Sequence, residues 1–108
     1  MTVNELCEKC GFSAVVLADG DREVAGCYIG DLLSWVMGRA KGDDAWITIM
    51  SNINIIAVAS LADVSCIILS EGVTVDSDII ETAKQKEVNI LSSSLPSYET
   101  AVRVSEQI

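Results

Sequence analysis

The segment from residue 42 to residue 72 constrains the fold of this chain more than any other stretch. It contains two apolar runs of strand length, separated by an apolar run long enough for a helix. In order, the predicted elements are a strand at 45–50, a helix at 53–61 and a strand at 65–69. Polar breaks follow the two strands at Ser51-Asn52 and Ser70-Glu71-Gly72. A strand–helix–strand unit of this kind pairs its strands in parallel through a right-handed crossover.

The flanking sequence continues the alternation of helices and strands. Its predicted elements are a helix at 2–10, strands at 12–18 and 24–29, a helix at 32–39, a helix at 75–87, a strand at 88–91 and a helix at 98–106. Thr2 and Glu5 form a capping-box pattern, and Asp31 and Asp76 are expected N-caps of the helices that follow them. The pattern predicts a small three-layer α/β domain with a mainly parallel sheet flanked by helices. The first two strands either join this sheet or form a separate hairpin-like edge, and the valine-rich first strand is expected to be buried.

The length and net charge of the chain limit the classes of protein to which it can belong. The 108 residues suit one domain spanning 1–108, in which residues 1–25 supply an N-terminal helix and strand. The net charge is −9, from 16 acidic and 7 basic residues, and the chain has no histidine. Without a basic patch, nucleic acid is excluded as a direct ligand. No apolar run reaches the roughly 18–20 residues of a membrane span, and the N-terminus does not resemble a signal peptide, so we expect a cytoplasmic protein.

Two predicted helices are apolar around most of their circumference, at residues 32–37 and 53–62. Such helices are well buried or contact a partner. Small domains with this much apolar surface often cover it by self-association, so we expect a homodimer. Trp35 and Trp46 are expected in the partly buried core, with stacking on a ligand or partner as the alternative.

Four cysteines raise the question of a metal or redox site. Cys7 and Cys10 form one CxxC motif near the N-terminus, whereas Cys27 and Cys66 lie within predicted apolar strands, where cysteine packs as a small hydrophobic residue. A second CxxC pair, which a zinc site would favour, is missing. We therefore expect no metal and no cofactor, and a cysteine-based redox or metal protein is kept as an alternative.

In an open parallel sheet, ligands bind beyond the carboxyl ends of the strands. Four small polar loops follow predicted strands, and backbone N–H groups at the helix starts beside them can bind an anion. The candidate ligand-binding residues are Gly30, Asp31, Ser51, Asn52, Ser70, Glu71, Gly72 and Ser92. The alternative interpretation is that these residues are ordinary helix caps and turns.

Catalytic chemistry has little support in this sequence. Histidine, the usual general base, is absent, and no GxxxxGK[ST] phosphate-binding loop is present. An enzyme, or the subunit of one, would have to use Asp31, Asp63 or Glu71 as a perturbed titratable group in a pocket.

From about residue 26 onward, the order of elements resembles the DRTGG domain family. The family shape is a strand ending in Gly-Asp-Arg, a helix, and a strand ending in Thr-Gly-Gly, followed by helix, strand and helix. Here Ser51-Asn52-Ile53 stands at the position of Gly-Asp-Arg, and Ser70-Glu71-Gly72 at that of Thr-Gly-Gly. Gly72 is the one motif residue retained. The matching later segments are 73–87, 90–92 and 97–101.

The resemblance implies a small regulatory or ligand-sensing module, often dimeric, without catalysis of its own. Domains of this family occur beside CBS domains and in the N-terminal region of some phosphotransacetylases. A relative is the N-terminal domain of HPr kinase/phosphorylase, whose phosphate-binding loop lies in a separate domain. We therefore expect a stand-alone regulatory module that binds a small polar or anionic ligand or a protein partner. An enzyme subunit and a cysteine-based protein are the alternatives.

Overall fold

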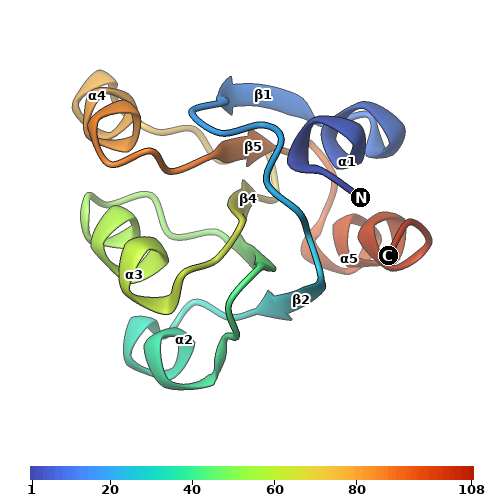
Figure 1. Ribbon diagram of the computed structural model, residues 1–108, viewed down its shortest axis with the longest axis horizontal. Helices are drawn as coiled ribbons and strands as arrows, with labels where there is room; N and C mark the ends of the chain where they lie inside the picture. The colour runs from blue at the N-terminus through green and yellow to red at the C-terminus, as the bar shows by residue number, and fades with distance from the viewer.

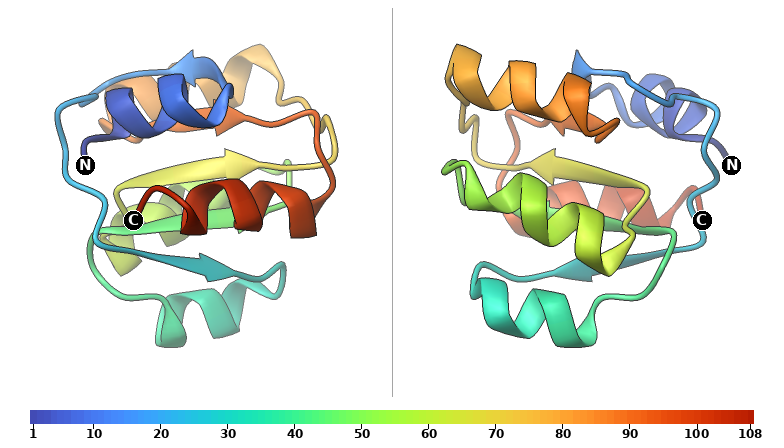
Figure 2. Two further views of the ribbon diagram at one scale, coloured as in Figure 1. Left: turned by 90° about the vertical axis from the view of Figure 1, so that its right-hand side faces the viewer. Right: turned by 60° about the vertical axis from the view of Figure 1, so that its left-hand side comes forward.

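The chain forms a five-stranded sheet between two layers of helices (Figures 1 and 2). The computed structural model describes residues 1–108. The strands are β1 (Ser13–Val16), β2 (Gly26–Ile29), β3 (Asp44–Thr48), β4 (Cys66–Leu69) and β5 (Ile90–Ser92). Their spatial order is β1-β5-β4-β3-β2, in which β2 to β5 are parallel and β1 is antiparallel to β5. The predicted three-layer α/β domain with a mainly parallel sheet is confirmed.

Helices cover both faces of this sheet. They are α1 (Val3–Cys10), α2 (Leu33–Arg39), α3 (Asn54–Ala62), α4 (Ser77–Gln85) and α5 (Ser97–Ser105). Figure 1 shows α2, α3 and α4 on one face of the sheet and α1 and α5 on the other. No helix combines the length and the hydrophobicity that crossing a bilayer requires.

The two central strands supply the core of both layers. Every residue of β3 and β4 is buried, as predicted for strands covered by helices on both faces. Side chains alternate along the strands, so Trp46 and Ile67 join the cluster under α3 and α4, whereas Ile47 and Ile68 join the cluster under α1 and α5. Trp46 is fully buried, which confirms its expected place in the core.

The first two strands occupy opposite edges of the sheet and do not pair with each other. β1 pairs with β5, and β2 pairs with β3, so both join the main sheet. The prediction of a buried first strand is wrong for Ser13 and Ala14, which are exposed. An edge strand lacks a neighbour on one side, and the helices pack over the middle of the sheet.

The predicted helix ends are partly confirmed. Thr2 and Glu5 form both hydrogen bonds of the capping box at α1. Asp63 ends α3 in a left-handed conformation, with φ of 58°. Asp31 does not cap α2, because Leu32 occupies that position and makes no capping side-chain bond. Asp76 does occupy the N-cap of α4, but its side chain forms no capping hydrogen bond.

Two helices are more exposed than their composition predicts. In α2 only Val36 is fully buried, while Trp35 is 52% exposed. Leu61 of α3 is 71% exposed, so this apolar helix is covered on one side and not on several. In α5 the inner face carries Thr100 and Val104.

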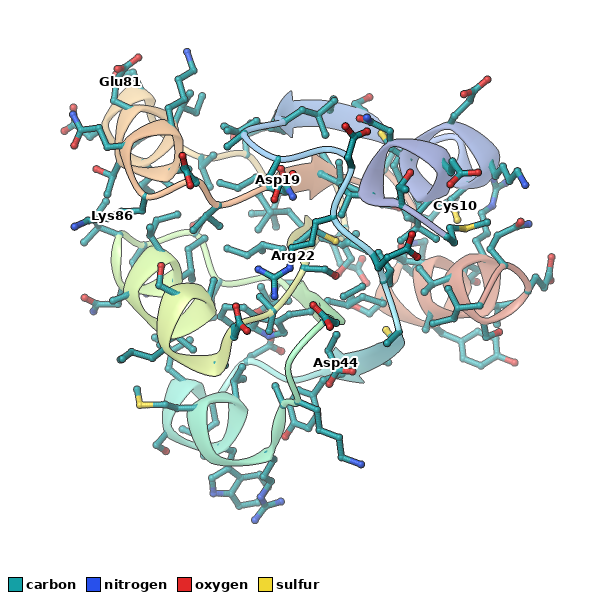
Figure 3. The ribbon with its side chains drawn as sticks, in the orientation of Figure 1. Cys10, Asp19, Arg22, Asp44, Glu81 and Lys86 are labelled. Carbon is teal, nitrogen blue, oxygen red and sulfur yellow. The ribbon has the colours of Figure 1, made fainter.

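Arg22 forms ion pairs at the edge of the sheet where the parallel strands β3 and β4 begin, here called the Arg22 edge (Figure 3). Its Nη2 lies 3.0 Å from Oδ1 of Asp43 and 2.9 Å from Oδ1 of Asp63. These two acids precede β3 and β4, and both have positive φ. Arg22 therefore joins the starts of two neighbouring strands.

Candidate functional site at the carboxyl ends of the parallel strands

The four polar loops chosen from the sequence lie at one edge of the sheet. Because β2, β3, β4 and β5 run in parallel, the residues that follow them emerge at the same edge (Figure 2). This edge is where open α/β sheets place their ligands. Whether this edge can bind a ligand depends on which of its side chains are already hydrogen-bonded within the chain.

The Gly30-Asp31 loop ties the end of β2 to β3. Oδ1 of Asp31 accepts hydrogen bonds from Oγ1 of Thr48 at 2.8 Å and from the backbone N–H of Ile49 at 2.9 Å. The carbonyl of Gly30 accepts one from Nε1 of Trp46 at 2.9 Å. Asp31 is thus engaged across the strand ends and not at the start of α2, since Thr48 and Ile49 offer two donors within reach.

The Ser51-Asn52 loop is bonded to the first turn of α3. Oδ1 of Asn52 accepts a hydrogen bond from the backbone N–H of Asn54 at 2.9 Å, which satisfies a free donor in the first turn of α3. Both residues are exposed. The N-cap of α3 is Ile53, which makes no side-chain capping bond, so Asn52 supports the first turn from the position before the cap.

The Ser70-Glu71-Gly72 loop is joined to the start of α5. Oε2 of Glu71 accepts the backbone N–H of Ser97 at 2.9 Å, and Oγ of Ser70 lies 2.7 Å from Oγ of Ser97. Glu71 adopts a left-handed backbone with φ of 61°, and Gly72 one with φ of 70°. The Glu71 carboxylate therefore occupies the helix N-terminus, which is where an external anion would bind.

Ser93 and Ser97 were not among the residues chosen from the sequence. Ser93 is buried, and its Oγ lies 2.8 Å from Oγ1 of Thr100 and accepts the N–H of Leu95 at 3.2 Å. Ser92, the predicted residue, is instead the last residue of β5. A run of three serines gives no signal for which one turns inward, because that depends on the register of β5 against β4.

None of the eight chosen residues lines any of the five cavities of the molecule. Asp31 and Glu71 are therefore not in a concave site. Asp63 borders a cavity of about 260 Å³, but there it is paired with Arg22. The enzyme interpretation required one of these acids in a pocket and free to act, and the geometry gives it no support.

Comparison with known proteins identifies the family. The sequence profile of the DRTGG domain matches residues 18–107. This chain belongs to the DRTGG domain family. A similar solved structure contains the CBS and DRTGG domains of the regulatory region of Clostridium perfringens pyrophosphatase, complexed with its activator, diadenosine tetraphosphate. The TM-score is 0.70 at 16% sequence identity, over 95% of this chain and 45% of that one, so the likeness concerns the fold. None of the curated proteins matches the chain.

In this DRTGG domain, the replaced motif residues explain the closed strand-end loops. Glu71 stands where the family shape has the first glycine of Thr-Gly-Gly, and its carboxylate accepts the N–H of Ser97 at the start of α5. Asn52 stands within the Gly-Asp-Arg position and accepts the N–H of Asn54 in the first turn of α3. The side chains that replace the motif are therefore hydrogen-bonded within the chain.

The four cysteines of the DRTGG domain do not form a common site. Burial raises the pKa of the Cys7 and Cys10 thiols, and it raises that of Cys66 to about 12. Cys27 keeps part of its surface exposed, yet desolvation by its neighbours still raises its pKa to about 11. Reactive cysteines have lowered pKa values, so these thiols lack the activation that redox chemistry needs. No three Cys, Asp or Glu side chains converge as metal ligands.

Proposed function

We propose that this DRTGG domain is a regulatory module that acts by binding and self-association, without catalysis of its own. The observation that carries the proposal is a group of exposed apolar side chains at the β2 edge, here called the β2-edge surface. It consists of Ile29, Leu32, Trp35 and Ile49, which are between 44% and 56% exposed. Large apolar side chains gathered in this way are typical of an interaction surface.

The β2-edge surface borders the β2 edge from both faces of the sheet, because Ile29 alternates in step with Ile47 toward the α1–α5 face, whereas Leu32 and Trp35 lie at α2 on the other face. Ile29 ends β2 beside Ile47 of β3, and the bond from Asp31 to the N–H of Ile49 holds the two strand ends together. Leu32 and Trp35 are one turn apart at the start of α2. The guanidinium of Arg39 lies 3.7 Å above the Trp35 ring and covers one of its faces.

The distribution of charge favours a second copy of the chain as the partner. The chain carries a net charge of −9, so most approaches between two copies are repulsive. Residues 32–42 contain no acid, and residues 45–62 contain no charged residue. Asp31 is the one acid within this surface, and its Oδ1 is held by Thr48 and Ile49, so two copies that meet there bury apolar area with few acidic groups nearby.

The test is sedimentation velocity from micromolar to millimolar concentration, with two matched variants. Trp35→Glu puts a negative charge in the β2-edge surface and should shift the chain toward monomer. Leu17→Glu makes the same kind of change at a 43% exposed residue near the opposite edge strand, and should leave association unchanged. A native chain that is monomeric throughout this range would refute the proposed dimer. Equal effects of both variants on association would refute the β2-edge surface as its interface.

For the regulatory signal, we propose a small polar or anionic ligand at the strand-end loops. The solved relative supports this class, because its regulatory region was crystallised with a nucleotide activator. In this chain, an anion would have to displace the Glu71 carboxylate from the N–H of Ser97. The proposed contact residues are those of the sequence prediction: Gly30, Asp31, Ser51, Asn52, Ser70, Glu71, Gly72 and Ser92.

Amide NMR shifts during titration with diadenosine tetraphosphate, and separately with inorganic phosphate, test the ligand. Binding at the loops should move the amide signals of Glu71 and Ser97 more than those of the Arg22 edge. Shifts confined to other regions, or none at millimolar ligand, would reject the strand-end site. A dimer that takes up neither probe would point to a role in protein interaction.

A further inference from the structure

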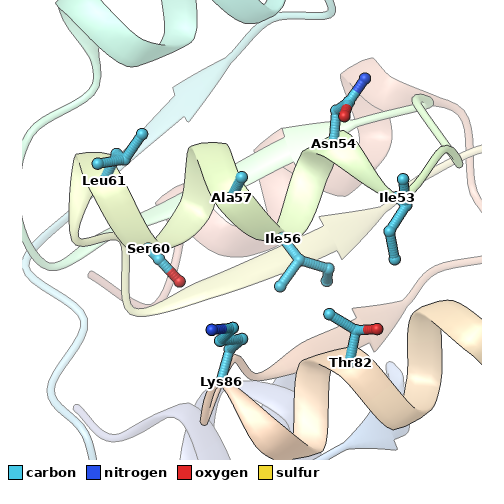
Figure 4. Close-up of a pocket in the computed structure, with 8 residues that line it drawn as sticks. All are labelled: Ile53, Asn54, Ile56, Ala57, Ser60, Leu61, Thr82 and Lys86. Carbon is cyan, nitrogen blue, oxygen red and sulfur yellow. The ribbon is translucent and has the colours of Figure 1, made fainter.

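A cavity of about 380 Å³ lies between α3 and α4, on the outer face of the helical layer (Figure 4). It is lined by Ile53, Asn54, Ile56, Ala57, Ser60, Leu61, Thr82 and Lys86. These residues are separate from the strand-end loops and from the β2-edge surface. The volume falls within the roughly 300–1,000 Å³ of small-molecule sites. We call this cavity the α3–α4 groove.

The groove has apolar walls and a single charge. Ile53 and Leu61 are 46% and 71% exposed, and Ile56 is packed into the core beside them. Lys86 is the one charged residue of the lining, although acids outnumber bases in the whole chain by 16 to 7. A groove of this composition attracts an anion with an apolar body and repels a cation.

Two polar groups of the groove, Lys86 and Ser60, have no partner in the chain, whereas the Thr82 hydroxyl donates to the carbonyl of Asp78. Lys86 forms no ion pair, whereas the nearby Lys84 pairs with Glu81 at 3.6 Å. The Ser60 hydroxyl forms no hydrogen bond within the chain, and Figure 4 shows Ser60 and Lys86 facing each other across the gap. Lys86 also borders the neighbouring 260 Å³ cavity, but the acids there, Asp19, Asp63 and Glu87, form no ion pair with it.

We propose that the α3–α4 groove binds a small amphipathic anion, with its headgroup between Lys86 and Ser60 and its apolar body along Ile53 and Ile56. Burying that body removes apolar surface from water, both on the ligand and on the exposed isoleucine. The headgroup pairs with an ammonium group that has no partner in the chain. The site does not depend on the dimer or on the strand-end loops.

Isothermal titration of the full chain with decanoate tests the groove, with decyltrimethylammonium as a probe of equal chain length and opposite charge. Decanoate should bind and the cationic probe should not. Equal binding of both probes would show that apolar contact alone determines the affinity, and this would overturn the assigned headgroup site. No binding of decanoate below its micellar concentration overturns the proposal as a whole.

Two lysine variants provide a matched comparison on the same stretch of chain. Lys86→Gln should weaken decanoate binding by roughly fivefold, the size expected for a partly exposed ion pair. Lys84→Gln removes an equal charge outside the lining and should leave the affinity unchanged. Equal losses in both variants would mean that only net charge matters, and the groove would then be wrongly placed.

Blocking the groove from inside gives an independent readout. Ser60→Glu places a carboxylate opposite Lys86, where it should pair with the lysine and abolish decanoate binding. Ser60 is exposed on a helix, and a circular dichroism spectrum like that of the native chain would confirm that the variant folds. Full decanoate affinity in a folded Ser60→Glu chain would refute the headgroup position. Sedimentation of the same variant should be unchanged, which separates this proposal from the proposed dimer.

Discussion

Glu71 combines two opposing contributions to stability, and they can be separated by substitution. Its φ of 61° is left-handed, which costs about 1 kcal/mol for a residue with a side chain. Its carboxylate accepts the N–H of Ser97 at 2.9 Å, and a capping bond of this kind stabilises by about 1 kcal/mol. The two contributions nearly cancel in the native chain.

Alanine and glycine at position 71 should therefore differ. Glu71→Ala removes the capping bond and keeps the left-handed backbone, so the free energy of unfolding should fall by about 1 kcal/mol, which is roughly 4–8 °C in Tm for a domain of this size. Glu71→Gly removes the same bond but relieves the backbone cost, so its stability should stay within about 0.5 kcal/mol of the native value.

Urea denaturation followed by circular dichroism, at one fixed protein concentration, measures these differences. Glu87 is the matched control, because its φ is 57° and its carboxylate forms no hydrogen bond. Glu87→Gly should stabilise the chain by about 1 kcal/mol, since no cap is lost. An alanine variant at position 71 as stable as the native chain would refute the capping bond. A Glu71→Gly chain less stable than Glu71→Ala would refute the backbone argument.

Three further predictions concern the core and the amino-terminal edge. Burial raises the pKa of Cys66 from 9.0 to about 12, so between these pH values the unfolded chain binds fewer protons than the native chain. The free energy of unfolding should therefore fall as the pH rises from 9 to 12, and it should fall less in Cys66→Ala. Urea denaturation at each pH measures this difference. Arg22→Gln breaks two partly exposed ion pairs and should cost roughly 1 kcal/mol in low salt and less in high salt, by the same measurement. Trp46→Phe leaves the Gly30 carbonyl without its donor and opens a cavity, so it should lower the free energy of unfolding by about 2–3 kcal/mol.

Elements whose signal is local and strong could be predicted from the sequence. β3 and β4 are short apolar runs with polar ends, and an all-apolar strand requires cover on both faces. The capping box of α1 is a contact between residues three apart, so tertiary structure cannot alter its spacing. The shared edge of the four loops also follows from local order, because consecutive strand–helix units make parallel strands.

The errors arise where long-range packing decides. Asp31 has the right position to cap α2, but Thr48, 17 residues later in the chain, offers it a hydroxyl 2.8 Å away. The composition of α2 predicts burial, yet the helix lies over an edge strand and has the sheet on one side only. The pairing of Glu71 with Ser97 spans 26 residues and depends on how α5 enters the sheet. None of these contacts has a signature in neighbouring residues.

A binding site needs polar groups whose hydrogen bonds and charges are not already satisfied within the chain. The strand-end loops and the α3–α4 groove differ in this respect. At the strand-end loops, Asp31, Asn52 and Glu71 all accept bonds from the chain itself. A ligand there gains only the difference between its own bonds and those it replaces. In the α3–α4 groove, Lys86 has no ion-pair partner, so a ligand headgroup displaces only water. An anion at the strand-end loops must therefore displace bonds within the chain, whereas an anion at Lys86 must not.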